Sequence, residues 1–234
     1  MNRSSLDSLN LSTVFIDDGG VLNDNARRAP EWRRLLGEYL PPRLGGTPEA
    51  WADANASVFE RSWARYMERM RSGSYRGIEA WMKADRAQWL LEMCELVGVA
   101  PPDDPAAYAI EVGTWVSERV RSAIPGTAEI VRWLASGGMT LHMASGGLSW
   151  ELAPYLRAMG ILPCFDRLYG PDLVDTTKNG PHFYEALLAD SRADPRTSVV
   201  VEDSAEVRGW AESVGLRAYR SLDELREALS ADSR

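Results

Sequence analysis

The sequence predicts an α/β protein in which helices cover both faces of a parallel sheet and an all-helical block is inserted near the start of the chain. Three observations support this prediction. A short apolar run over 14–16 is followed at once by two carboxylates and two glycines. The segment 25–124 shows helical spacing of apolar residues and almost no strand pattern. Beyond it, short apolar runs alternate with amphipathic segments, which is typical of parallel strands joined by helices.

The first predicted element is a buried strand over 14–16, because an apolar run bounded by Gly is typical of one. Asp17 and Asp18 follow directly, at the end of the strand where open α/β sheets bind ligands. Gly19 and Gly20 allow the backbone to turn sharply and to approach a ligand closely. We therefore expect the active site to begin at Asp17.

The inserted block is expected to consist of amphipathic helices. Pro41 and Pro42 are predicted to end the first helix, and Gly98 to end the third. The predicted helices cover residues 31–39, 48–70, 78–97 and 106–120. Tryptophans recur along these helices at helical spacing, which favours packing in a core for most of them over lining a substrate pocket. The block therefore predicts an all-helical subdomain.

The remainder of the chain is expected to alternate helices and strands. The predicted strands cover 139–144, 165–169, 198–201 and 216–219. The predicted helices cover 125–134, 150–159, 183–188, 205–214 and 222–229. With the first strand they form one sheet, so the prediction is a core made of 1–24 and 125–234 with the helical segment 25–124 inserted.

Composition limits the classes of function. The 234 residues carry a net charge of −8, which argues against a nucleic-acid partner because phosphate backbones select basic surfaces. A phosphorylated small molecule can still bind at a locally positive site. Cys94 and Cys164 are the two cysteines and indicate neither a disulfide framework nor a zinc site. The polar start of the chain and the lack of long apolar runs favour a cytoplasmic protein without a membrane partner. The chain is expected to act as a monomer or a homodimer.

Polar side chains gather where the predicted strands end. Asp17 follows the first strand, Ser145 the second, and Glu202 with Asp203 the fourth. Lys178 lies in a predicted loop and is one of two lysines in a chain that otherwise uses arginine, so a compact ammonium is expected to matter there. Taken singly, each has a plainer explanation as a turn former or helix cap.

Together these segments resemble four motifs of the haloacid dehalogenase superfamily, a group of mostly phosphate-handling hydrolases that use an aspartate nucleophile. The motifs occur in order as IDDGGVL at 16–22, SGG at 145–147, KNGPHFY at 178–184 and VEDS at 201–204. The resemblance covers nearly the whole chain and implies a Rossmann-like core. Many members insert a helical cap between the first two motifs, which is where the predicted helical block lies.

The resemblance implies a catalytic carboxylate and a metal ion. Asp17 would be the nucleophile and would share Mg²⁺ with Asp203 and Glu202, while Gly19 could offer its main-chain carbonyl. A carboxylate can attack phosphorus and hold the phosphoryl group as an acyl phosphate. A divalent cation is needed because a dianionic substrate repels the attacking carboxylate.

The other matching positions are implied to bind the substrate, which is expected to be a small phosphorylated metabolite. Ser145 and the amides around Gly146 would hold phosphate oxygens, and Lys178 would steady both the phosphate and the nucleophile. The catalytic set implied by the resemblance is therefore Asp17, Ser145 and Lys178.

One position departs from the family pattern. Most phosphatases of this superfamily carry a second aspartate two residues after the nucleophile, which protonates the leaving group, and this chain has Gly19 there. Asp18 lies one residue too early, on the opposite side of a continuing strand. General acid–base help contributes roughly 10²–10⁴-fold in rate, so an ordinary alkyl phosphate should be a poor substrate.

Several alternatives follow from that departure. Either the substrate carries a good leaving group, or a residue such as Asp24, Glu31 or His182 supplies the acid. The chain could instead be a metal-independent 2-haloacid dehalogenase, although Glu202 and Asp203 weaken that interpretation. A phosphonate hydrolase would need a Schiff-base lysine, for which Lys83 is the candidate in the helical block. A catalytically silent binding protein is a further possibility.

Overall fold

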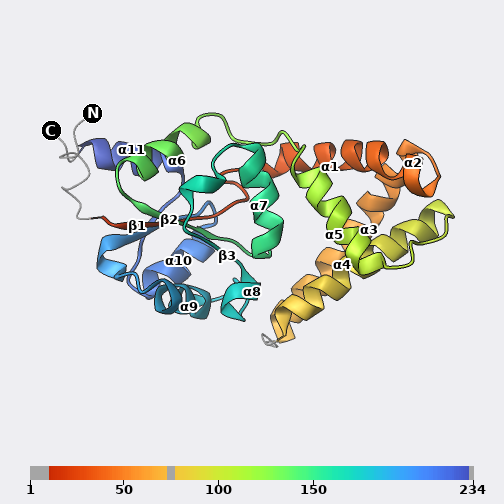
Figure 1. The fold of residues 1–234 in the computed structure, drawn as a ribbon. Helices are drawn as coiled ribbons and strands as arrows, with labels where there is room; N and C mark the ends of the chain where they lie inside the picture. Colours follow the sequence, from red (N-terminus) through yellow and green to blue (C-terminus); the bar gives the residue numbers. More distant parts are fainter. Residues whose placement is uncertain (1–10, 73–76, 232–234) are drawn as a thin grey trace. The chain divides into compact units, whose positions relative to one another are not determined.

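The structure is a computed structural model that describes residues 11–72 and 77–231. It divides into two compact units (Figure 1). The core unit consists of Met1–Asn25 and Ala123–Arg234, and the helical unit is Ala26–Ser122.

The core unit contains a five-stranded sheet in the order β3-β2-β1-β4-β5, and every neighbouring pair is parallel. The strands are β1 (Thr13–Ile16), β2 (Thr140–Ala144), β3 (Arg167–Tyr169), β4 (Ser198–Val201) and β5 (Arg217–Tyr219). This confirms the predicted α/β fold class. Ile16 at the end of β1 is aligned with Met143 of β2 and Val201 of β4. The residues that follow these three strands therefore emerge at the same edge of the sheet.

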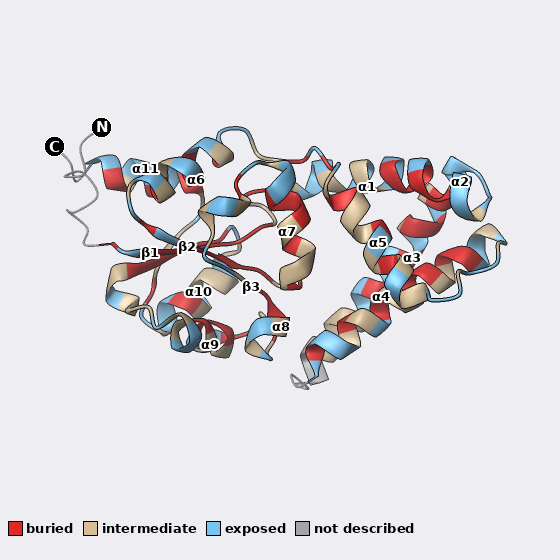
Figure 2. Cartoon of the chain, viewed as in Figure 1, coloured by how far each residue is buried: buried red, intermediate tan, exposed pale blue. Residues whose placement is uncertain are grey.

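Helices cover both faces of this sheet (Figures 1 and 2). Val14 and Ile16 pack on one face and Phe15 on the other, as alternation along a strand requires. The first face is covered by α6 (Thr127–Ser136), α7 (Ser149–Ala158) and α11 (Leu222–Ala231). The second is covered by α9 (Pro181–Ser191) and α10 (Ala205–Ser213). The central strands β1 and β4 are buried along their whole length and are apolar after their first residues, Thr13 and Ser198, because helices cover both faces.

The helical unit contains five helices among its described residues, 26–72 and 77–122: α1 (Asn25–Tyr39), α2 (Pro41–Leu44), α3 (Pro48–Ser72), α4 (Ile78–Val97) and α5 (Pro105–Ser117). Gly98 ends α4 in the left-handed region, at φ 77°, as expected for a helix C-terminus. Asp104 caps α5 by accepting a hydrogen bond of 3.0 Å from the amide of Ala107.

One predicted helix boundary was wrong, and several short helices were not predicted. Helix α1 begins at Asn25, before Pro30, although the sequence pattern placed its start after that proline. The predicted end of this helix before Pro41 is confirmed, at Tyr39. Pro41 also opens the short helix α2, because proline at a first helical position has no amide that the helix would use. The short helices α8 (Pro171–Val174), η2 (Leu162–Cys164) and η3 (Pro195–Thr197) were not predicted, since three or four residues show no periodicity.

The tryptophans of the helical unit are only partly in its core. Trp51 and Trp89 are buried, which agrees with the prediction, whereas the side chain of Trp63 is 54% exposed. Within the helical unit Trp63 stacks on Tyr66, with ring centroids 5.4 Å apart.

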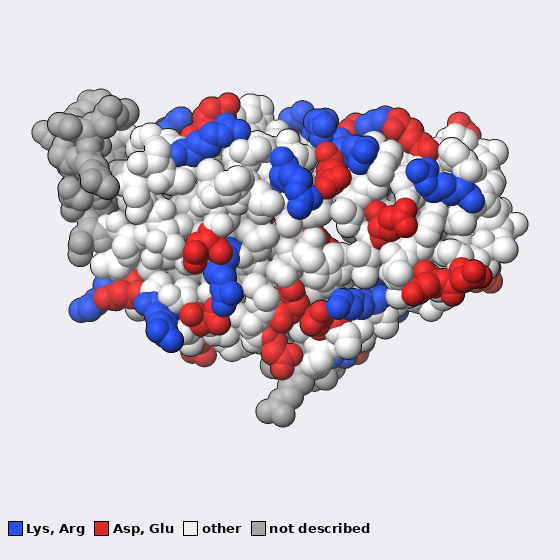
Figure 3. All heavy atoms as spheres, viewed as in Figure 1, with Lys and Arg blue, Asp and Glu red and all other residues white. Residues whose placement is uncertain are grey.

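Charged side chains of both signs are interspersed on the face drawn in Figure 3. The net charge of −8 is thus not gathered into one acidic patch on this face. Among residues 11–72 and 77–231, none of the helices combines the length and the apolar character needed to span a bilayer.

His142 is a buried base in the middle of β2. Its ring lies 5.3 Å from that of Phe15 and 5.4 Å from that of Tyr169, and its Nδ1 has no hydrogen-bond partner within the described part of the chain. Burial lowers the pKa of His142 below its ordinary 6.5, although Asp166 and Asp190 act in the opposite direction and Arg167 in the same one. The neutral imidazole is therefore the form that the fold accommodates.

We expect His142 to make the protein less stable in mild acid. Because the folded state binds the proton less well than the unfolded chain, its contribution is lost as pH falls below the unfolded pKa of 6.5. Urea denaturation of the wild type and of His142→Gln is measured at several pH values between about 7.5 and 5. As pH falls, the free energy of unfolding of the wild type should decrease more than that of His142→Gln. His182→Gln is the control, and a pH-independent difference for His142→Gln would contradict the expectation.

Candidate active site

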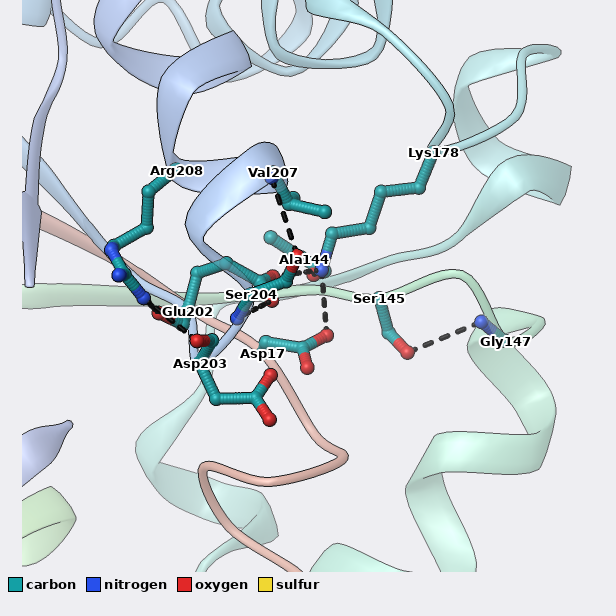
Figure 4. Close-up of polar contacts among 10 residues, drawn as sticks. All are labelled: Asp17, Ala144, Ser145, Gly147, Lys178, Glu202, Asp203, Ser204, Val207 and Arg208. Carbon is teal, nitrogen blue, oxygen red and sulfur yellow. Dashed lines mark hydrogen bonds and ion pairs between the residues drawn. The ribbon is translucent and has the colours of Figure 1, made fainter. Parts of the chain in front are cut away.

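The candidate site lies at the edge of the sheet where β1, β2 and β4 end (Figure 4). Asp17 continues β1 by one residue, and its amide donates to the Val201 carbonyl at 3.0 Å. The amide of Glu202 is held in the same way by the Tyr219 carbonyl, at 2.9 Å. The sheet therefore fixes the backbone from which both carboxylates project.

Lys178 links the ends of these strands. It comes from the loop before α9, and its Nζ donates to Asp17 Oδ1 at 2.7 Å and to Glu202 Oε2 at 2.6 Å. Its third hydrogen bond, of 2.8 Å, goes to the Ala144 carbonyl at the end of β2. An ammonium has three N–H donors, and these three hydrogen bonds use all of them. The side chain is only 8% exposed, so the ion pairs are buried.

Asp203 adds a third carboxylate to the two that Lys178 contacts. One oxygen from each of Asp17, Glu202 and Asp203 lies within 4.8 Å of the others, and Asp203 is the exposed member. Glu202 is further fixed by the amide of Ser204, which donates to its Oε1 at 3.0 Å. The cluster thus has three carboxylates and one ammonium, which contacts two of them, so it has an excess of negative charge.

Burial and mutual repulsion shift the acids of this cluster. Burial raises the pKa of Asp17, against the opposing effect of Lys178. Burial also raises the pKa of Glu202 to about 7, with Lys178 lowering it and Asp17 raising it. Burial by itself would lower the pKa of Lys178, but Asp17, Tyr184 and Glu202 hold it above its usual range. The lysine is therefore charged, and a further cation would offset the excess negative charge of the three carboxylates.

Asp18 is directed into the turn that follows β1. Its Oδ1 accepts a hydrogen bond of 2.7 Å from Asn23 Nδ2, and its carbonyl accepts from the amides of Leu22 and Asn23, both at 2.9 Å. Asp18 and Asn23 are 5% and 2% exposed, respectively. The second carboxylate of the first motif thus shapes the turn that carries Gly19 and Gly20.

Ser145 lies at the end of β2, beside the carboxylate cluster (Figure 4). Its amide donates to the Tyr169 carbonyl at 3.0 Å, and its Oγ accepts from the amide of Gly147 at 3.1 Å. Gly146 lies between them, just before α7. This loop places a hydroxyl and backbone amides at the edge of the sheet, a combination suited to anion binding.

A family model described as haloacid dehalogenase-like hydrolase matches residues 11–208. The chain belongs to this family. The match spans all four motifs, including the loop of Lys178 and the acidic pair after β4. No curated protein sequence matches the chain.

Solved structures similar to this haloacid dehalogenase-like hydrolase share its fold at low sequence identity. One is L-2-haloacid dehalogenase from Xanthobacter autotrophicus with chloropropionic acid covalently bound, with 17% identity, a TM-score of 0.58, and coverage of 89% of this chain and 76% of that one. A defluorinating L-2-haloacid dehalogenase has 15% identity, a TM-score of 0.65, and coverage of 89% and 80%. YfnB of Bacillus subtilis, described as a HAD-hydrolase bound to magnesium, has 16% identity, a TM-score of 0.60, and coverage of 94% and 98%.

The carbonyl of Gly19 accepts neither of the two hydrogen bonds that close the turn after β1. The bridge between Gly19 and Asn23 uses the amides of Gly20 and Asn23, the first donating to the Asn23 carbonyl at 2.7 Å and the second to that of Asp18. The Gly19 carbonyl thus takes no part in either of these hydrogen bonds. This carbonyl is the atom of Gly19 that the family resemblance implies as a metal ligand.

Two supporting contacts of this hydrolase were not predicted. Arg208 Nη1 donates to the carbonyls of Glu202 and Asp203, each at 2.8 Å, and so holds the backbone of the fourth motif. The Ala144 carbonyl anchors Lys178. The sequence offered a weak signal for Arg208, an arginine in the first turns of the helix that follows an acidic pair. It offered none for a backbone carbonyl.

Gly20 brings the first motif against Asp203. It adopts φ 82°, and a Cβ built there would lie 2.0 Å from Asp203 Oδ2. Any side chain at this position must therefore displace the Asp203 carboxylate.

We expect Gly20→Ala to weaken Mg²⁺ binding by about 10–100-fold, the range seen when groups that position a metal ligand are lost. Gly138→Ala is the matched control, because Gly138 also has a positive φ, of 89°, but a Cβ there meets nothing within 4 Å. Both variants carry a similar backbone strain, so calorimetric Mg²⁺ titration isolates the effect on Asp203. Equal affinities in the two variants would mean that Asp203 does not bind the ion.

Proposed function

We propose that this chain is a Mg²⁺-dependent phosphohydrolase that acts on a small phosphorylated metabolite through Asp17. The observation that carries the proposal is the convergence of Asp17, Glu202 and Asp203 to within 4.8 Å around a single ammonium. Carboxylate oxygens are the donors that Mg²⁺ prefers, and the excess negative charge gives a cation a favourable place. The donor set therefore fits the ion.

Asp17, Glu202 and Asp203 would hold the ion together with the carbonyl of Gly19. Bound there, Mg²⁺ would neutralise phosphate oxygens and so reduce their repulsion of the nucleophile. Lys178, which already contacts Asp17 at 2.7 Å, keeps that carboxylate ionised and oriented.

The reaction then proceeds in two displacements. An oxygen of Asp17 forms a bond to phosphorus, the bond from phosphorus to the leaving group breaks, and its electron pair departs with that group. Water next attacks the phosphorus of the aspartyl phosphate, which restores the Asp17 carboxylate and releases inorganic phosphate and a proton. Ser145 and the amides around Gly146 are assigned to the phosphate oxygens, in the loop before α7.

We assign the catalytic function to the sequence-predicted core, 1–24 and 125–234, and the function of a substrate-selecting cap to 25–124. The assignment is supported by the location of Asp17, Ser145, Lys178 and the acidic pair, all of which belong to the core unit.

A 2-haloacid dehalogenase is the second candidate, because several of the similar structures bear that name. In that reaction Asp17 would attack carbon and displace a halide, which leaves without a proton, and the resulting ester would be hydrolysed. Lys178 pairs with Glu202, but among the described residues no cation pairs with the Asp203 carboxylate. A metal-free reaction leaves Asp203 without a counter-ion, so this carboxylate favours the phosphohydrolase. A phosphonate hydrolase is disfavoured because Lys83, the one Schiff-base candidate, is exposed and paired with Glu79 at 2.6 Å.

The candidates separate in one assay panel. Purified protein is given p-nitrophenyl phosphate, acetyl phosphate or 2-chloropropionate, each with Mg²⁺ and with a chelator. The proposal expects phosphate release that depends on Mg²⁺. Halide release that a chelator leaves unchanged would establish the second candidate instead, and inactivity towards all three substrates would favour a catalytically silent binding protein.

A further inference from the structure

The space above Gly19 is occupied by the side chain of Asn25. A Cβ built on Gly19 would lie 3.0 Å from both Nδ2 and Oδ1 of Asn25. Asn25 is the first residue of α1 and belongs to the core unit. The space that a side chain at position 19 would need is thus occupied by a carboxamide from the start of this helix.

This carboxamide is available to a bound molecule. Asn25 is exposed, and its side chain makes no hydrogen bond to the described residues 11–72 and 77–231. An amide can donate and accept hydrogen bonds, but it does not give up or take a proton near neutral pH. At this position it can orient a leaving group or a water molecule, and it cannot protonate the one or deprotonate the other.

Two other polar side chains of the site, Asp18 and Lys178, are already engaged. Asp18 is bound to Asn23, and Lys178 is held by Asp17, Glu202 and the Ala144 carbonyl. Among the described residues, Asn25 is the side chain nearest to a Cβ built on Gly19, and no hydrogen bond to them holds its carboxamide.

We propose that Asn25 makes the chain selective for phosphoric anhydrides, such as acyl phosphates, over alkyl phosphates; this rests on the proposed phosphohydrolase function. When Asp17 attacks an acyl phosphate, the bond from phosphorus to the acyl oxygen breaks and the electron pair leaves on a carboxylate. Carboxylates are stable anions at neutral pH, since their pKa lies near 4. An alkoxide leaving group would need a proton that Asn25 does not supply.

The same carboxamide is expected to affect the rate of the second displacement, the hydrolysis of the aspartyl phosphate. Because Asn25 orients water without deprotonating it, the aspartyl phosphate on Asp17 should be hydrolysed slowly. The phosphorylated protein is then expected to accumulate during turnover, where intact-protein mass spectrometry detects it.

Asn25→Asp tests this directly, because it keeps the size of the side chain and adds a titratable carboxyl. An acidic residue in the first turn of a helix is stabilising, so the variant is expected to fold. Turnover of glycerol 3-phosphate should rise about tenfold or more, toward the 10²–10⁴-fold that general acid–base help contributes. The rate at which acetyl phosphate phosphorylates the protein should change little. Its steady-state turnover should rise with the faster hydrolysis of the phosphoprotein, which should accumulate less. Asn25→Ala, which removes the amide without adding an acid, should give no gain on glycerol 3-phosphate.

The outcomes separate this inference from the proposed function. If Asn25→Asp and Asn25→Ala equally change the ratio of the rates at which acetyl phosphate and glycerol 3-phosphate phosphorylate the protein, or neither changes it, Asn25 does not select the leaving group, while phosphohydrolase activity stands. If the wild-type protein with Mg²⁺ hydrolyses neither phosphate, the proposed function fails and the selectivity fails with it.

Discussion

Asp17→Asn is expected to abolish hydrolysis of every substrate, with a loss in kcat of about 10³-fold or more, as for other enzymes that lose their nucleophile. The neutral amide is a far weaker nucleophile than a carboxylate. The substitution also removes the charge that Lys178 contacts at 2.7 Å, so both the attacking group and its orientation are lost. Initial rates with acetyl phosphate, together with the mass of the protein during turnover, measure the effect. The phosphorylated form should vanish with the activity.

Asp18→Asn is the matched control for Asp17→Asn. The two positions are neighbours, both buried, and the same charge is removed in each case. The amide oxygen of the substituted side chain can still accept a hydrogen bond from Asn23, so the turn should persist. We expect Asp18→Asn to retain activity within about tenfold, since neutral acceptors give somewhat weaker hydrogen bonds than charged ones. Activity that survives Asp17→Asn but not Asp18→Asn would assign the nucleophile to Asp18 and overturn the register of the first motif.

The sheet could be predicted from the sequence because its signals are local. β4 is a run of one serine and three valines, and its predicted bounds of 198–201 agree with the observed strand Ser198–Val201. The edge strand β5 is shorter than predicted, starting at Arg217 in place of Leu216, because pairing with β4 decides where it begins. Pattern identifies an element, and tertiary contacts set its ends.

The candidate site was predictable residue by residue but not as an arrangement. Motif spacing singled out Asp17 and Lys178, yet their contact joins positions 161 residues apart and depends on the alignment of three strands. The function of Asp18 was not predictable, because its partner Asn23 becomes a neighbour only after the turn is formed. For the same reason nothing in the segment from 16 to 25 indicated that Asn25 would cover Gly19.

Lys178→Met is expected to lower both activity and stability. Removing one partner of a buried ion pair leaves an uncompensated charge, which typically costs about 3–5 kcal/mol. Here two buried carboxylates, Asp17 and Glu202, lose their shared counter-charge. Protonation of the carboxylates offsets part of that cost, so the loss should shrink as pH falls. Urea denaturation with and without Mg²⁺ measures it.

Mg²⁺ should rescue the stability of Lys178→Met without restoring its activity. With the ammonium gone, the three carboxylates of the cluster repel one another more strongly, and a bound cation relieves more of that repulsion than in the wild type. The increase in stability on adding Mg²⁺ is therefore expected to be larger in the variant than in the wild type. Hydrolysis should stay low, because the ion does not replace the contact that orients Asp17.

Lys83→Met provides the comparison, since Lys83 is the other lysine of the chain. Its Nζ pairs with Glu79 at 2.6 Å, four residues earlier on α4, and its side chain is 44% exposed. Exposed pairs of this kind contribute about 0.3–0.5 kcal/mol, so the variant should unfold close to the wild type and respond to Mg²⁺ as it does. If Lys178→Met behaved like Lys83→Met in both measurements, the ammonium of Lys178 would not be compensating the carboxylates, and the charge argument for a cation at this site would lose its basis.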